Sequence, residues 1–283
     1  MKTCPSTLII GCGYVGLPLA QHLMTQGHQV DGWVHSTASA DTLAGAGFHR
    51  LIIGNVGASV IWDQIDRDYD QVIHCASSSR GGPEAYQEVF LWGGMLMNQR
   101  QPRARRLMIS STSVYGQVGG ELVNEESTAE PGTETGKILR AAETNALEAG
   151  VTVVRSSGIY GPGRAALWEK FRRGDAVIEG DGLRWINQIH QRDLVQALFH
   201  LIDHGEAGQI YNATDHCPVT QLDFYTWCSD FLRQPMPPYG PVNTQRKRGL
   251  TNKRVSNAKL CATGWAPVYP SFREGLRADY SPR

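Results

Sequence analysis

The sequence lacks an excess of charge of either sign. Lysine and arginine together number 27, and aspartate and glutamate also number 27, so the formal net charge at pH 7 is zero. A balanced chain has no broad electrostatic attraction for nucleic acid or for an anionic membrane, and we expect neither as a partner. Two short basic runs stand out, at 103–106 and 246–248. We expect the first to be a solvated face, whereas the second could instead face an anionic substrate.

The sequence also lacks paired cysteines and long apolar runs. Its six cysteines form no C-x-x-C pair and show no metal-ligand spacing, which predicts reduced thiols in a cytoplasm and no metal site. The first apolar run, Leu8 to Ile10, stops at a glycine loop, so we expect no ordinary signal peptide. No other stretch approaches the roughly 20 apolar residues that cross a bilayer. With 41% hydrophobic and 19% charged residues, the chain is expected to fold around a packed core.

A glycine motif stands near the N-terminus. Residues 7–10 read as a short strand, and G-C-G-Y-V-G follows, with Gly11, Gly13 and Gly16 at the spacing of a dinucleotide-binding loop between a strand and a helix. Gly11 permits the turn and Gly13 lets the backbone approach a pyrophosphate, while Gly16 lets the helix pack closely on the strand. The motif predicts a Rossmann-type site for NAD or NADP. The cofactor contacts expected in this loop are Gly11, Gly13, Tyr14, Val15 and Gly16.

The end of the second strand bears on the choice between the two dinucleotides. An acidic residue for the ribose 2′-hydroxyl of NAD is expected about 20 residues beyond the loop. His35 and Ser36 stand there instead, and Asp31 comes earlier, in mid-strand. No carboxylate would repel a 2′-phosphate, and His35, Ser36 and Thr37 can hydrogen-bond to one. The sequence therefore leans slightly towards NADP, with His35 and Ser36 as cofactor contacts.

Strand and helix patterns continue to alternate beyond this segment, as in repeated βαβ units. They are a strand at 70–76, a helix at 83–98, a strand at 106–110, a helix at 135–149 and a strand at 151–155. After residue 160, glycine and proline become frequent and strands become short. We also place Ala76 and Ser77, at the end of the strand at 70–76, among the cofactor contacts.

These patterns predict an α/β protein with an NAD(P)-binding Rossmann fold, a doubly wound parallel sheet and a smaller C-terminal substrate lobe. The Rossmann domain is expected over 1–160 and the substrate lobe over 161–283, with some Rossmann elements returning at about 186–213. Such a lobe would cover the carboxyl ends of the strands, where ligands of open α/β sheets bind.

Several motifs occur together and in order, and through them the chain resembles a known family. They are G-C-G-Y-V-G at Gly11, S-S-T-S-V-Y-G at 110–116, I-Y-G-P-G-R at 159–164, I-H-Q-R-D-L-V at 189–195, I-Y-N-A at 210–213 and G-W-A-P-V-Y-P at 264–270. Over nearly its whole length the chain resembles extended and atypical short-chain dehydrogenases/reductases of the NAD-dependent epimerase/dehydratase type. It falls with those that lack the catalytic tyrosine.

The resemblance implies a set of catalytic residues. Ser111 would hydrogen-bond the substrate oxygen, with Thr112 and Arg164 as further substrate contacts. The family's Asp-Glu dehydratase pair is replaced by Thr112 and Ser113, which disfavours a sugar-nucleotide dehydratase of the usual kind. The family's Tyr-x-x-x-Lys motif reads T-E-T-G-K here, with Thr133 at the tyrosine position and Lys137 at the lysine position.

The replacement of tyrosine by Thr133 weakens the expected chemistry. A phenol with a pKa near 10 can be lowered to exchange protons near neutrality, whereas an aliphatic hydroxyl lies far outside that range. Thr133 can donate a hydrogen bond but is no ordinary general base, and Lys137 could still hold the nicotinamide ribose. Among other proton carriers, Tyr115 and Tyr160 are expected to pack their loops, and His74 is expected to be a structural histidine within its apolar strand.

Two functions of different classes follow from these residues. The first is an NAD(P)-dependent oxidoreductase or epimerase-like enzyme for a small polar substrate, such as a nucleotide sugar. The second is a dinucleotide-binding sensor or regulatory protein with little redox activity, because Thr133 replaces the tyrosine. A third option is an enzyme whose protons pass through substrate, water or a displaced tyrosine. The resemblance also implies a homodimer formed through the helices at 83–98 and 135–149.

Overall fold

The computed structural model of the chain describes residues 4–79, 81–244 and 251–280, so the basic run at 246–248 lies outside the described residues. The chain divides into two compact units. The first comprises Met1–Val114, Ala129–Arg155 and Val195–Tyr211, and the second comprises Tyr115–Thr128, Ser156–Leu194 and Asn212–Arg283. The chain thus passes repeatedly between the units; the sequence analysis predicted a boundary near residue 160 and a return to the Rossmann domain at about 186–213.

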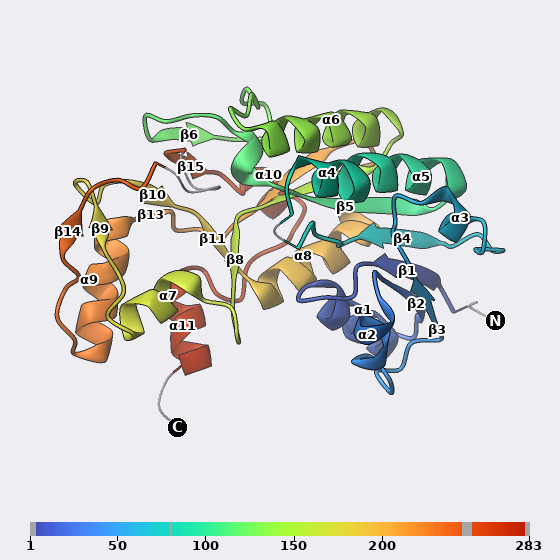
Figure 1. Ribbon diagram of the computed structural model, residues 1–283, viewed down its shortest axis with the longest axis horizontal. Coiled ribbons are helices and arrows are strands. Elements are labelled where there is room, and N and C mark those ends of the chain that lie inside the picture. The colour runs from blue at the N-terminus through green and yellow to red at the C-terminus, as the bar shows by residue number, and fades with distance from the viewer. Residues whose placement is uncertain (1–3, 80, 245–250, 281–283) are drawn as a thin grey trace. The chain divides into compact units, whose positions relative to one another are not determined.

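The first unit is built on a seven-stranded sheet with the order β12-β7-β5-β4-β1-β2-β3 (Figure 1). Parallel pairing joins β5 to β4, β4 to β1, β1 to β2 and β2 to β3. The strands are β1 (Ser6–Ile10), β2 (Gln29–Val34), β3 (Arg50–Ile53), β4 (Gln71–His74), β5 (Arg105–Ser111), β7 (Thr152–Ser156) and β12 (Ile210–Ala213). The predicted doubly wound parallel sheet is confirmed.

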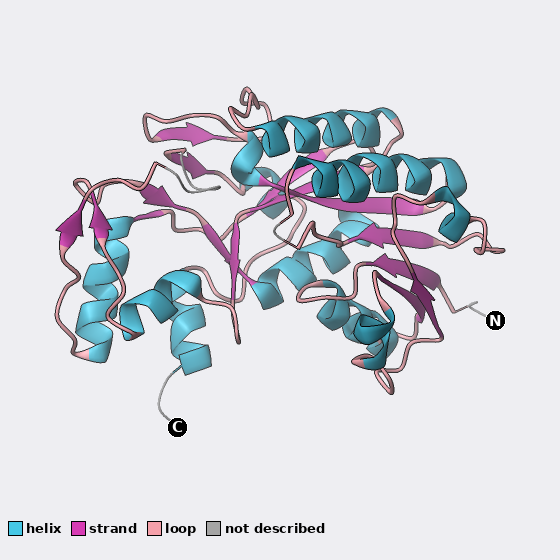
Figure 2. Ribbon diagram, in the orientation of Figure 1, coloured by secondary structure: helices cyan, strands magenta, loops and turns pink. Residues whose placement is uncertain are grey.

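Helices cover both faces of this sheet (Figure 2). One face carries α1 (Gly16–Thr25), α2 (Thr37–Asp41) and α8 (Gln191–His204), and the other carries α4 (Pro83–Tyr86), α5 (Gly93–Arg100) and α6 (Glu134–Glu148). The short helix α3 (Ser59–Trp62) contacts α5. Because both faces are covered, all five residues of β1 are buried.

The helix expected at 83–98 is not a regular α-helix throughout. A π-helical segment, η1 (Gln87–Trp92), separates α4 from α5. Within it, the Val89 carbonyl oxygen accepts a hydrogen bond from Nε2 of His74 at 3.0 Å. This hydrogen bond joins the π-helical segment to the end of β4.

The strand order reverses beside β1, and this creates the switch point of the fold. From β1 the chain builds β2 and β3 on one side and then β4 and β5 on the other. The register pairs Ile10 with His74, so the loops that leave β1 and β4 emerge together at the carboxyl edge. In open α/β sheets this is the edge where ligands bind.

The second unit has short strands and its own core, formed around Trp168, Phe224, Tyr225 and Phe272. Its strands are β6 (Glu121–Val123), β8 (Gly158–Tyr160), β9 (Ile178–Glu179), β10 (Trp185–Ile186), β11 (Gln188–His190), β13 (Val219–Thr220), β14 (Tyr239–Gly240) and β15 (Lys253–Val255). Its helices are α7 (Ala166–Arg172), α9 (Gln221–Leu232), α10 (Ala258–Ala262) and α11 (Phe272–Tyr280).

The prediction of a solvated face for the basic run at 103–106 is wrong for two of its arginines. Arg105 donates hydrogen bonds to the carbonyl oxygens of Leu201, Ile202 and Gly205 at the end of α8. Arg106 is buried, and its guanidinium donates to the Ala149 carbonyl at the end of α6. Both residues lie in β5, and their side chains extend from the strand to the C-terminal ends of α8 and α6. A cation is favourable there because the carbonyl groups at the C-terminus of a helix carry partial negative charge.

Lys253 is a buried cation of the second unit. Its Nζ donates to the Tyr115 carbonyl at 2.9 Å and to the Thr251 hydroxyl at 2.6 Å, and its side chain is 5% exposed. Burial lowers the pKa of the Lys253 ammonium from 10.5 to about 8, because the charged form loses hydration.

Lys253 should make the stability of the protein rise with pH between about pH 8 and pH 10.5. In this window the unfolded chain holds the Lys253 proton and the folded chain has lost it, so raising the pH favours the folded state. The gain is on the order of 3 kcal/mol. Denaturant unfolding across this window measures it. Lys253→Met should flatten the rise relative to wild type, whereas the exposed control Lys170→Met should not; equal pH dependence in all three proteins would contradict the assignment.

Candidate functional site

The glycine loop fits closely against the end of β4. Gly11 has φ +89°, and a Cβ atom there would overlap the backbone of Ala76. A Cβ on Gly16 would overlap the Gly11 carbonyl oxygen and press on Ile9 of β1. Both positions therefore require glycine for the fold itself, and Gly11 and Ala76, both expected cofactor contacts, lie side by side.

Gly13 differs from the other two glycines. A Cβ placed on Gly13 would meet no atom within 4 Å, so the fold does not itself exclude a side chain here. Gly13 precedes α1, which begins at Gly16, and only Tyr14 and Val15 lie between them in the chain. A helix N-terminus favours negative charge, and a bare backbone beside it lets a diphosphate approach. The loop thus fits the phosphates of a dinucleotide.

The end of β2 carries no free carboxylate. Asp31 is buried in mid-strand, where its carboxylate accepts a hydrogen bond from the Tyr69 hydroxyl at 2.6 Å and lies 3.0 Å from Nδ1 of His49. His35 follows the strand and is exposed. Ser36 caps α2, its Oγ accepting from the Ser39 amide at 3.3 Å. The Asp31 carboxylate therefore has a structural role in contacts with Tyr69 and His49, in agreement with its early position in the strand.

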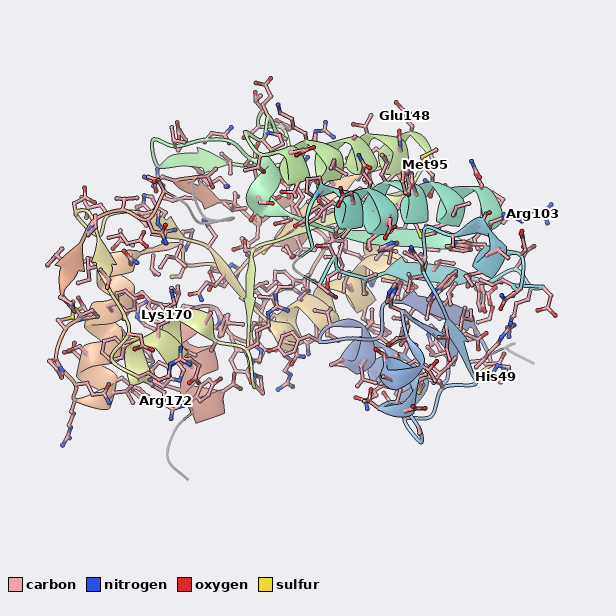
Figure 3. The ribbon with its side chains drawn as sticks, in the orientation of Figure 1. His49, Met95, Arg103, Glu148, Lys170 and Arg172 are labelled. Atoms are coloured by element: carbon pink, nitrogen blue, oxygen red, sulfur yellow. The ribbon has the colours of Figure 1, made fainter. Side chains whose placement is uncertain are left out.

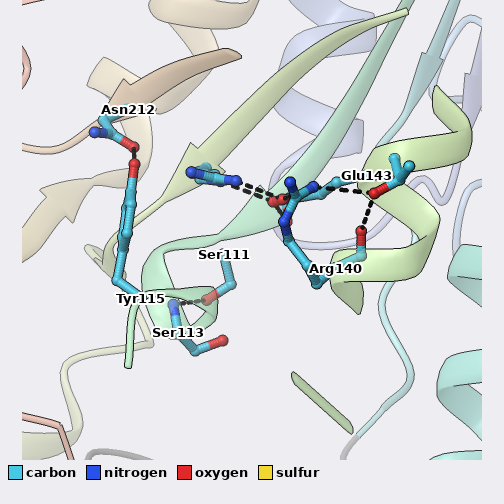
Figure 4. Close-up of polar contacts among 9 residues, drawn as sticks. Ser111, Ser113, Tyr115, Arg140, Glu143 and Asn212 are labelled. Atoms are coloured by element: carbon cyan, nitrogen blue, oxygen red, sulfur yellow. Dashed lines mark hydrogen bonds and ion pairs between the residues drawn. The ribbon is translucent and has the colours of Figure 1, made fainter. Parts of the chain in front are cut away.

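Ser111 ends β5 beside the predicted site. It is half-buried, and its Oγ accepts a hydrogen bond from the Ser113 amide at 3.1 Å (Figure 4). In that contact the Ser111 hydroxyl oxygen is the acceptor, so the hydroxyl proton could be donated to a substrate oxygen. Thr112 is buried and begins the short 3₁₀ turn η2 (Thr112–Val114), while Ser77, after β4, is exposed.

Thr133 and Lys137 lie at the start of α6. Thr133 is the N-cap, and its Oγ1 accepts a hydrogen bond from the Gly136 amide at 3.2 Å. Lys137 lies one turn further along, and both side chains are exposed. Since α6 contacts β5 and η2, these residues and Ser111 lie on adjoining elements of the first unit. The local reason for threonine at position 133 is helix capping.

Other residues considered at the sequence level are engaged elsewhere. Arg164 belongs to the second unit, in an exposed turn bridged to Gly161. Tyr115 is fully buried and its hydroxyl donates to Asn212 at 2.9 Å (Figure 4). Tyr160 is buried too, and burial raises the pKa of its phenol far above the usual range. Neither tyrosine is placed to exchange protons near neutrality.

The histidine and a cysteine beside the loop are also unreactive. Burial lowers the pKa of His74 to about 4, so the ring is neutral and its Nε2–H donates to Val89. Burial raises the pKa of the Cys12 thiol to about 12, which leaves almost no thiolate at neutral pH.

The sequence analysis missed a buried ion pair close to the site. Glu143 of α6 and Arg155 of β7 are 0% and 1% exposed, and their closest atoms are 2.6 Å apart. A weak signal exists in the sequence, because Glu143 falls on the otherwise apolar stripe formed by Leu139, Ala142 and Ala146. Periodicity alone would not have identified its partner on a separate strand.

Two features are absent from the described residues 4–79, 81–244 and 251–280. No helix among them combines the length and apolar character needed to cross a membrane. Within the same ranges, no group of three or more histidine, cysteine or acidic side chains could hold a metal ion.

A parallel sheet wound in this order, with a glycine loop at its switch point, defines a Rossmann-fold protein of the dinucleotide-binding class. The chain belongs to the NAD dependent epimerase/dehydratase family, whose model matches residues 7–214. The sequence-based family assignment is thereby confirmed.

The chain is also similar to individual proteins, either in sequence or in fold. The chain is 28% identical over 263 residues to Protein YeeZ of Escherichia coli K12, covering 88% of this chain and 92% of that protein. Its fold is similar to UDP-glucose 4-epimerase with UDP-glucose from Thermotoga maritima, at a TM-score of 0.81, 20% identity and 97% coverage of both chains. It is also similar to dTDP-glucose 4,6-dehydratase in complex with NAD from Bacillus anthracis, at a TM-score of 0.81, 18% identity and coverage of 98% and 95%.

The different surroundings of Gly13 and Gly16 predict opposite effects of the same added methyl group. Gly13→Ala should leave the thermal midpoint nearly unchanged but weaken dinucleotide binding by at least about tenfold, and Gly13→Asp should abolish binding. Gly16→Ala should instead lower the midpoint, because its Cβ would overlap the Gly11 carbonyl. Calorimetric titration and thermal unfolding separate the two effects. Undiminished binding by Gly13→Asp would show that the phosphates lie elsewhere.

Proposed function

We propose that the protein is an NAD(P)-dependent oxidoreductase of the epimerase/dehydratase kind that acts on a small polar substrate, with a nucleotide sugar as the first candidate. The observation that carries the proposal is the open space at Gly13 beside the start of α1, between two glycines that the fold itself requires. Of the three glycines in the motif, Gly13 is the one whose missing side chain would make room for a ligand and not for a neighbouring part of the chain.

Residues of the first unit have chemical roles in this proposal. When bound, the nicotinamide would accept or return a hydride. The Ser111 hydroxyl would donate to the substrate oxygen, since its own oxygen already accepts from Ser113. The exposed ammonium of Lys137 would hold ribose hydroxyls from the first turns of α6. We further propose Ala76, Ser77, Tyr14 and Val15 as cofactor contacts and Thr112 as a substrate contact.

We propose a small pocket of the second unit as a candidate substrate site. It has a volume of about 220 Å³ and is lined by Glu179, Gly180, Asp181, Leu183, Arg184, Val242 and Asn252. Carboxylates, a guanidinium and an amide together suit hydroxyl groups, and the volume suits a sugar-sized group more than a whole nucleotide sugar. UDP-glucose in the Thermotoga maritima epimerase gives the class of compound to try first. We propose this unit as the substrate lobe, with Arg164 as a further substrate contact.

The second candidate function is a dinucleotide-binding sensor or regulator with little redox activity. The observation in its favour is that the Thr133 hydroxyl caps α6 and has no acidic character to offer. Both candidates share the dinucleotide site and differ only in proton transfer.

A second copy of the chain is the macromolecular partner that we propose. Trp92 and Met95, on the segment formed by η1 and α5, are 47% and 40% exposed. Figure 3 labels Met95 on α5 and Glu148 at the end of the neighbouring helix α6. Pairing through these helices would cover both apolar side chains. We also propose a cytoplasmic location, which six free cysteines suit.

The role of Thr133 is tested by restoring the tyrosine. Thr133→Tyr should raise turnover by roughly 10² or more, because a phenol one helical turn from Lys137 can act as a general acid or base. Hydride transfer is followed by the absorbance of the reduced nicotinamide over a panel that includes UDP-glucose and dTDP-glucose. Thr133→Phe is the matched control, since it removes the same helix cap, worth about 1 kcal/mol, without supplying a hydroxyl.

Three outcomes separate the candidates. A gain in Thr133→Tyr alone supports the oxidoreductase with a weakened proton step. Dinucleotide binding with no turnover in either protein supports the sensor. Wild-type turnover near the typical value of about 10 per second, unchanged in Thr133→Tyr, would show that another group carries the proton.

The proposed lean towards NADP is tested by titration with both dinucleotides. We expect tighter binding of NADP, because no carboxylate follows β2 and the exposed His35 can donate to a 2′-phosphate. His35→Ala should reduce the affinity for NADP and leave that for NAD within about twofold. If the wild-type protein binds NAD more tightly than NADP, the proposed preference for NADP is wrong, whereas the proposal of a dinucleotide site is unaffected.

A further inference from the structure

One carboxylate joins three elements of the first unit. Glu143 of α6 accepts hydrogen bonds from Arg155 of β7, with Nε to Oε1 at 2.9 Å and Nη2 to Oε2 at 2.6 Å. Its Oε1 also accepts from the hydroxyl of Ser110 in β5 at 2.6 Å. All three residues are buried, at 0%, 1% and 4% exposure.

A buried ion pair of this kind holds a helix on a sheet at a large cost in desolvation free energy. Removing two charges from water costs several kcal/mol each, and apolar side chains of similar volume often stabilise a protein equally well. The two-pronged contact between the Arg155 guanidinium and the Glu143 carboxylate does, however, fix direction as well as distance. A fixed geometry is what this pair offers beyond apolar packing.

Two of the three connected elements, β5 and α6, carry residues of the candidate site. Ser110 directly precedes Ser111 at the end of β5. Lys137 lies six residues before Glu143 on the same helix, about 9 Å along its axis. The outer contact of Glu143 with Arg140, at 3.5 Å, adds a second cation on the solvent side of the carboxylate. The position of Ser111 relative to α6 therefore depends on a hydrogen bond of its neighbour to Glu143.

We propose that Glu143 is a positioning residue for the nicotinamide end of the site. Through Ser110 it holds Ser111 in register with the start of α6, and Arg155 fixes the carboxylate in the orientation that Ser110 requires. The proposal rests on the proposed dinucleotide function. It concerns only the nicotinamide half of the ligand, because the glycine loop and the end of β2 are not connected to Glu143 by any of these hydrogen bonds.

Comparison of two ligands distinguishes positioning from simple stabilisation. NAD contains the nicotinamide ribose whose hydroxyls Lys137 would hold, whereas ADP shares the adenosine diphosphate half and lacks that ribose. Ser110→Ala removes the hydroxyl and keeps the ion pair, so it should weaken binding of NAD by about fivefold while binding of ADP stays within about twofold. Isothermal titration calorimetry measures both affinities, and thermal unfolding records the stability of each variant.

Thr152→Val is the matched control. Thr152 is fully buried at the opposite end of β7, and its hydroxyl donates to the Glu206 carbonyl at 2.9 Å. Its loss removes a buried hydrogen bond of the same sheet, so stability should fall about as in Ser110→Ala. The ratio of the NAD and ADP affinities should nevertheless remain that of wild type.

Glu143→Gln provides a second and stronger variant. The amide can still accept from Ser110 but leaves the buried Arg155 without a countercharge, so the protein should be less stable. If it folds, the affinity ratio should change in the same direction as in Ser110→Ala; if it does not, Ser110→Ala decides the matter. An unchanged ratio in Ser110→Ala would overturn the positioning role. Failure of the wild-type protein to bind either ligand would instead overturn the proposed function.

Discussion

The close approach of the glycine loop to the end of β4 is the constraint on which the candidate site depends. Gly11 can lie against the Ala76 backbone only because it has no Cβ, and Gly16 can lie against the Gly11 carbonyl for the same reason. These contacts hold the loop at the switch point between β1 and β4. The open space at Gly13 follows from them, because both neighbouring glycines are already fixed by packing.

A second constraint acts on the other side of the site, through α6. This helix is capped by Thr133, carries Lys137 in its first turns and buries Glu143 against β5 and β7. Capping and ion pairing thus determine where the helix begins and how it is oriented. The hydroxyl of Thr133 stabilises the helix start by accepting a hydrogen bond from the Gly136 amide.

Most of the architecture could be predicted from local patterns. At the N-terminus a short strand-like run precedes the glycine loop and a helix follows it, and the observed β1 and α1 agree with this order. The parallel sheet followed from the alternation of strands with helices. The prediction for the basic run at 103–106 was wrong because charge in a sequence does not reveal which helix ends lie close to a strand. Arg105 and Arg106 donate hydrogen bonds to carbonyl oxygens at the ends of α8 and α6.

The sequence by itself determined the fold class, the family and the place of the glycine loop, since each depends on residues that are neighbours in the chain. Only the tertiary structure decided that Gly13 faces open space while Gly11 and Gly16 face their own chain. It alone brought Ser110, Glu143 and Arg155 together from three separate elements. The physical reason is that hydrogen bonding and steric contact depend on distances of a few ångströms, and distant segments reach such distances only when the sheet is assembled.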